Sequence, residues 1–79
     1  MKKYEVYEIN EGKHHSICVC EDIEIARVIA YLLAKDDFVH DKYFVTEILD
    51  KKDTFSFSVD WHEEYYFKDG KVVRERIVM

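Results

Sequence analysis

Residues 22–35 read Asp-Ile-Glu-Ile-Ala-Arg-Val-Ile-Ala-Tyr-Leu-Leu-Ala-Lys, and this stretch decides the fold because its helical periodicity is the clearest in the chain. Asp22 is a good N-cap residue, since its carboxylate can accept hydrogen bonds from the first backbone N–H groups of a helix. Lys35 lies at the other end, where a cation is favoured by the helix dipole. We therefore predict one helix over about residues 22–35.

Two apolar stripes lie side by side on this helix. The first combines small and large side chains: Ala26, Ile29, Ala30 and Leu33. The second consists of larger side chains: Ile25, Val28 and Leu32. Together the stripes cover roughly 200°, whereas a helix that rests on one sheet needs only ~100° or more. The first stripe predicts close packing on a sheet. The second needs another cover, which is either the C-terminal segment or a second copy of the protein.

The remainder of the chain is typical of strands and turns. Strand-formers alternate with polar residues or run together in these segments: 3–9, 15–20, 42–49, and 54–61 running into a hairpin of 62–68 and 71–78. The predicted fold is α+β, with a mostly antiparallel sheet in β-β-α-β-β-β order and one helix packed on it. The simplest sheet has the first strand in the centre, flanked by the second and third.

The C-terminal hairpin leaves two questions open. Asp69-Gly70 between apolar runs indicates a two-residue turn, which places Tyr65 opposite Arg74. A bulge at Gly70 would instead place Glu64 opposite Arg74, and the first register is preferred. The hairpin either extends the sheet, folds over its open face or reaches a neighbouring molecule.

Composition limits the classes of function. The chain has 79 residues, a formal net charge of −5, two glycines and no proline, which indicates one well-ordered domain. Acidic residues are concentrated between residues 21 and 60, and the basic stripe of a nucleic-acid-binding protein is missing. The sequence shows neither a signal peptide nor an apolar run of the ~20 residues that span a bilayer. We expect a cytoplasmic protein with reduced thiols and no nucleic-acid or membrane partner.

His14, Cys18 and Cys20 are the best candidates for chemistry. On a regular strand they share one face, and histidine and cysteine are zinc ligands. Strand neighbours two positions apart lie roughly 6.5–7 Å from each other, which argues against a tetrahedral site. Two small packed side chains and a histidine at a turn are the preferred interpretation. Redox use of Cys20, which precedes the helix, is an alternative, because a thiol there can have a lowered pKa.

The sequence lacks a phosphate-binding loop, a nucleophile elbow and a cooperating pair of carboxylates, so we expect no catalytic activity and no cofactor. The leading hypothesis is a protein-interaction module that forms a homodimer or binds another protein. The interface candidates are the second helical stripe and three aromatic residues near the C-terminus: Ile25, Val28, Leu32, Trp61, Tyr65 and Phe67. The alternative is an acidic regulator or inhibitor, of bacterial or phage origin, that docks on a basic partner. A metal or redox site at the two cysteines is a more remote alternative.

The segments Tyr-Glu-Val-Tyr-Glu-Ile at residues 4–9, Ile-Cys-Val-Cys at 17–20 and Tyr-Phe-Val-Thr-Glu-Ile at 43–48 surround a helix begun by Asp22. In this arrangement the chain resembles small uncharacterised proteins of Gram-positive bacteria and their phages. The resemblance spans about residues 3–49. It implies a ββαβ unit without an assigned activity, and no functional residue carries over from it.

Overall fold

The structure is a computed structural model that describes residues 2–36, 42–51, 54–56 and 61–78. Its elements are β1 (Lys3–Asn10), β2 (Lys13–Cys20), α1 (Ile23–Asp36), β3 (Tyr43–Lys51), β4 (Thr54–Ser56), β5 (Trp61–Lys68) and β6 (Lys71–Val78). They confirm the predicted α+β class with a single long helix. In place of one strand over residues 54–61 that runs into the hairpin, the structure has two separate strands, β4 and β5, so the order contains one strand more than predicted. Residues 57–60 lie outside the described part of the chain.

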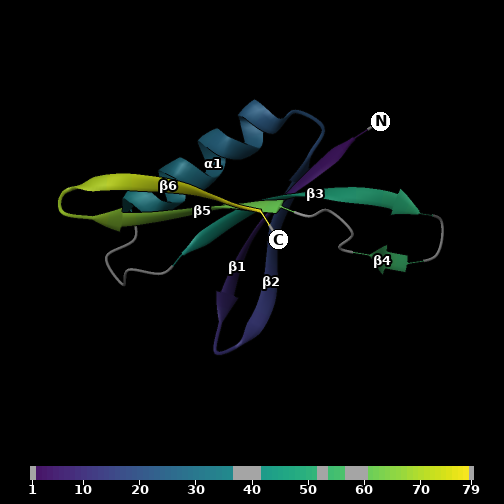
Figure 1. Cartoon of the computed structure of the whole chain (residues 1–79), viewed down its shortest axis with the longest axis horizontal. Helices are drawn as coiled ribbons and strands as arrows, with labels where there is room; N and C mark the ends of the chain where they lie inside the picture. The colour runs from purple at the N-terminus through teal and green to yellow at the C-terminus, as the bar shows by residue number, and fades with distance from the viewer. Residues whose placement is uncertain (1, 37–41, 52–53, 57–60, 79) are drawn as a thin grey trace.

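The strands form one antiparallel sheet in the order β2-β1-β3-β5-β6 (Figure 1). β1 lies between β2 and β3 as expected, and β3 is the middle strand of the five. One edge of β3 is shared, because its first residues pair with β5 and its last residues pair with β4. The C-terminal hairpin extends the sheet, which settles the question that the sequence left open. Figure 1 shows α1 lying across one face of the strands.

Both tight hairpins turn over two residues with positive φ angles. Glu11 and Gly12 have φ of 54° and 76°, and Asp69 and Gly70 have φ of 54° and 82°. Positive φ at both central positions is the type I′ turn, whose twist matches that of the flanking strands. The second turn places Tyr65 opposite its partner Arg74 on β6, so the preferred register is confirmed.

The helix begins at the expected cap and packs through its smallest side chains. The Asp22 carboxylate accepts a hydrogen bond of 2.8 Å from the backbone N–H of Glu24. Three alanines spaced four residues apart are fully buried against the sheet: Ala26, Ala30 and Ala34. They form the core together with one residue from each of three neighbouring strands: Val6, Val45 and Tyr65. Small side chains allow the helix axis to come close to the strands, as the first stripe predicts.

A β-bulge interrupts the pairing of β1 with β2. Val6 lies opposite Cys18, and the next residue of β1, Tyr7, lies opposite Ser16. Ile17 is therefore the extra residue on β2. Side chains normally alternate between the two faces of a strand. One inserted residue interrupts this alternation, so the residues of β2 before the bulge point to the opposite face from the one that a regular strand would give them.

The turn at Gly70 provides a test of the hairpin geometry. A Cβ built on Gly70 meets no atom within 4 Å, so Gly70→Ala adds only the strain of a positive φ. We expect a loss of about 1 kcal/mol and a melting temperature lower by roughly 4–8 °C, measured by thermal unfolding. Lys71→Ala, at the neighbouring exposed position, is the matched control and should change stability little. Equal losses in the two variants would contradict the type I′ geometry.

Candidate interaction site on the outer face of α1

The second apolar stripe of α1 faces away from the sheet. Ile25, Val28 and Leu32 retain 54%, 56% and 52% of their surface exposed, and Tyr31 beside them retains 45%. We call these four residues the outer face of α1. Single exposed apolar residues are common on proteins, but four on adjacent turns of one helix form a patch. The C-terminal segment was one of the two expected covers for this stripe. The hairpin that it forms leaves the stripe exposed.

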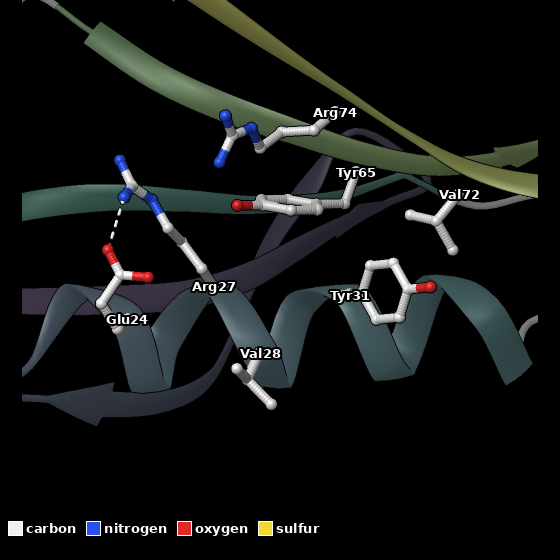
Figure 2. A pocket seen from close by; sticks show the side chains of 7 residues that line it. All are labelled: Glu24, Arg27, Val28, Tyr31, Tyr65, Val72 and Arg74. Atoms are coloured by element: carbon white, nitrogen blue, oxygen red, sulfur yellow. Dashed lines mark hydrogen bonds and ion pairs between the residues drawn. The ribbon is translucent and has the colours of Figure 1, made fainter.

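A pocket of about 360 Å³ borders this outer face, between α1 and the β5–β6 hairpin. Seven side chains line it: Glu24, Arg27, Val28 and Tyr31 from α1, Tyr65 from β5, and Val72 and Arg74 from β6. Figure 2 shows the two arginines and the Tyr65 hydroxyl at one end and the ring of Tyr31 near Val72 at the other. The pocket thus has a polar end and an apolar end.

Arg27, at the polar end of the pocket, forms an ion pair with Glu63, which lies outside the pocket lining. Arg27 Nε and one terminal nitrogen donate to the two Glu63 oxygens at 3.0 and 2.9 Å, and the other terminal nitrogen donates to Glu24 at 2.9 Å. The Tyr65 hydroxyl also donates to Glu63, at 2.9 Å. Only 2% of Glu63 is exposed, so these three hydrogen bonds compensate for the burial of its charge.

Electrostatics fixes the protonation states of this group. Burial acts to raise the pKa of Glu63, but the hydrogen bonds from Arg27 and Tyr65 outweigh it, and the pKa lies below the ordinary value. Burial, followed by the hydrogen bond to Glu63, raises the pKa of Tyr65 to about 12. The hydrogen bond to Glu63 also raises the pKa of Arg27. At neutral pH the carboxylate and guanidinium are charged and the phenol is neutral.

Arg74 stands at the rim of the pocket with a different set of contacts. It lies opposite Tyr65 on the neighbouring strand, and its guanidinium acts to lower the pKa values of both Tyr65 and Glu63. The ion pairs among the described residues join Arg27, but not Arg74, to a carboxylate. Arg74 is exposed, so its remaining N–H groups face solvent at the pocket mouth.

None of the three aromatic interface candidates belongs to the outer face of α1, although Tyr65 lines the pocket that borders it. Tyr65 is 2% exposed and belongs to the core, so only the small part of it that lines the pocket is accessible. Trp61 is half-buried, and the Arg76 guanidinium lies 4.8 Å from its ring centroid. Phe67 is half-buried opposite Val72 on β6. Only the helical members of the predicted set lie together on an exposed patch.

The expectation that His14, Cys18 and Cys20 share a face is wrong. The bulge at Ile17 leaves both cysteines on the face that α1 covers and moves His14 to the open face of the sheet. There His14 Nε2 lies 2.9 Å from a Glu5 oxygen. The residues that the structure describes contain no group of three or more potential metal ligands.

The two cysteine sulfurs lie 4.0 Å apart, and both are free thiols. Burial, followed by the hydrogen bond and charge of Cys20, raises the pKa of the Cys18 thiol. A raised pKa favours the protonated form, which is a poor nucleophile and metal ligand. Packing under α1 is thus the role that the geometry favours for Cys18.

A row of four aromatic rings, which the sequence pattern did not predict, crosses the open face of the sheet. Tyr7 stacks on His14 at a centroid distance of 4.2 Å and on Phe44 at 5.0 Å, and His62 meets the edge of Phe44 at 5.6 Å. Tyr7 and Phe44 are only 9% and 7% exposed. Burial, followed by the charges of Glu5 and Glu64, raises the pKa of Tyr7 to about 12. The neighbouring rings thus enclose the two central ones, which leaves little ring surface for a ligand.

Comparison of the chain with protein-family models, with curated proteins and with solved structures found no match. The resemblance to small ββαβ proteins of Gram-positive bacteria and phages therefore stays a prediction. In the stretches of chain that the structure describes, no helix has both the length and the apolarity needed to cross a bilayer.

The buried ion pair predicts a specific pH dependence. Because the folded-state pKa of Glu63 lies below its ordinary value of 4.5, the ionised carboxylate stabilises the fold above pH 4.5, and this contribution is lost as the pH falls through the lower, folded-state value. Glu63→Gln should lower the free energy of unfolding at neutral pH by about 1.5–3 kcal/mol and flatten its acid dependence. Denaturant unfolding at a series of pH values measures both effects.

Glu24→Gln is the matched control, because Glu24 also pairs with Arg27 but its side chain is 72% exposed. Exposed pairs contribute at most about 1 kcal/mol, so this variant should keep nearly all of the wild-type stability and acid dependence. An unchanged acid dependence in Glu63→Gln would contradict the stabilising role of the buried pair.

Proposed function

We propose that this chain is a small interaction module that forms a homodimer by packing the outer face of α1 against the same face of a second copy. The carrying observation is that Ile25, Val28 and Leu32 each remain more than half exposed on consecutive turns of the main helix. A two-fold symmetric interface needs a patch that is complementary to itself, and one apolar helical stripe meets that condition.

The pattern of the stripe favours a second copy as the partner. Ile25, Val28 and Leu32 are spaced by three and then four residues, which is the spacing of a seam between two packed helices. In an antiparallel pair, the acidic first turn at Glu24 lies near Lys35 of the other copy. The helix dipoles also oppose each other favourably in this arrangement. Charge and shape therefore agree on a two-fold antiparallel contact.

The proposal places the protein in the cytoplasm and assigns it no catalytic step. Support for a reducing compartment comes from the two free thiols. The adjacent acids Glu63 and Glu64 point to opposite faces of β5, where they pair with Arg27 and Lys42 respectively. The alternative role as an acidic regulator of a basic partner, and a bacterial or phage origin, stay predictions.

Replacing both ends of the stripe tests the dimer. Ile25→Glu combined with Leu32→Glu should weaken association by about 100-fold or more, because each apolar side chain contributes about 1.5–3 kcal/mol on burial. Analytical ultracentrifugation over a concentration series measures the dissociation constant, and circular dichroism confirms that the variant is folded. Val19→Glu, at a residue of β2 that is 51% exposed, is the matched control and should dimerise like the wild type.

A charge exchange tests the orientation of the two helices. Lys35→Glu should weaken the dimer, and adding Glu24→Lys on the same chain should restore it, since every antiparallel contact then has its charges reversed. A wild-type chain that remains monomeric at all accessible concentrations would overturn the proposal. Equal disruption by the Val19 control would move the interface away from α1.

A further inference from the structure

We infer that the pocket between α1 and the β5–β6 hairpin binds a small monocarboxylate with an apolar body. The carboxylate pairs with Arg74, and the body packs on Val28, Tyr31 and Val72. This binding site and the proposed dimer interface differ in what they bind, although Val28 and Tyr31 of α1 belong to both.

The charges around the pocket determine the charge of the ligand. Arg27 is matched by the carboxylates of Glu63 and Glu24, at distances of 2.9 Å each. Arg74 forms no ion pair with a carboxylate among the described residues, and it lies opposite Tyr65 on the neighbouring strand. The four charged groups sum to zero, but Arg74 is the one cation of the described pocket lining whose N–H groups are not held by a carboxylate. A guanidinium group in this state can bind a carboxylate through two parallel hydrogen bonds.

The positions of the acidic groups favour a single negative charge over two. Glu24 is held against Arg27, and in Figure 2 its carboxylate lies on the side of Arg27 away from Arg74. Glu63 lies close by, since it accepts a hydrogen bond from the Tyr65 hydroxyl. Both acids would repel a second negative charge, and the pocket lining offers no further unmatched cation to offset it. A monocarboxylate thus fits better than a phosphate dianion.

The size and the apolar end determine the body of the ligand. A volume of about 360 Å³ lies within the ~300–1,000 Å³ range of small-molecule sites, which combine apolar walls with a few convergent polar groups. Figure 2 shows the Tyr31 ring and Val72 flanking the space beyond the Tyr65 ring, with Val28 on the helix side. An aromatic or branched aliphatic group can occupy this space while its carboxylate reaches Arg74.

Benzoate is a suitable probe, with the neutral isostere benzamide and the dianion phenyl phosphate for comparison. Titration is followed by amide chemical shifts in the Ile25→Glu/Leu32→Glu variant, because neither residue lines the pocket and the result then does not depend on dimerisation. We expect saturable shifts at Tyr31, Val72 and Arg74 with benzoate and at least about tenfold weaker binding of the other two probes.

Arg74→Gln should weaken benzoate binding by about tenfold or more, because the charge-assisted contact is lost. Arg76→Gln is the matched control, since Arg76 is an exposed arginine of the same strand that lies over Trp61 instead. Shifts that fail to saturate, or benzamide binding equal to that of benzoate, would overturn the inference. So would equal effects of the two arginine substitutions.

Discussion

The close contact between the alanine face of α1 and the centre of the sheet determines the rest of the molecule. Ala26, Ala30 and Ala34 are fully buried, and they let the helix lie near Val6 and Val45 on the two central strands. A helix held this close by small side chains presents its larger ones elsewhere. The exposed outer face of α1 and the pocket beside it both follow from this choice of packing surface.

The Arg27–Glu63 pair connects that core to the surface. Glu63 lies on the covered face of β5, where an uncompensated carboxylate would be costly, so Arg27 is drawn down from the helix to meet it. Tyr65 completes the group and is itself part of the core. The same contacts that satisfy a buried charge therefore fix one wall of the pocket and leave Arg74 as the charged group at its mouth.

Features with a local signature were predictable from the sequence. Asp22 at the helix start and Asp69-Gly70 at the last turn act through their nearest neighbours, and the helix bounds and hairpin register followed from them. The apolar arc is wider than one sheet requires, which predicted that the sheet alone would not cover Ile25 and its stripe; whether the C-terminal segment would cover it was left open. The placement of Arg27 was not predictable in this way, since its partner Glu63 lies 36 residues away in the sequence. The available signal for this ion pair was Glu63, an acidic residue two positions before Tyr65 and on the same face of the strand.

The bulge at Ile17 had no such signature, because no glycine marks the position, and His14 was consequently assigned to the wrong face. Tertiary pairing, which a single strand does not encode, decides where an extra residue is accommodated.

β6 is the last strand in the sheet order, and its middle residues are Arg74, Glu75 and Arg76. Were another copy to add to this edge about Glu75, glutamate would oppose glutamate and arginine would oppose arginine across the new ladder. Such like-charge pairs are destabilising, and charged edges are how natural sheets resist open-ended growth. Fibril-like polymerisation through this edge is thereby disfavoured. The chain exposes an apolar face on its helix, but its charged edge strand opposes aggregation through the sheet.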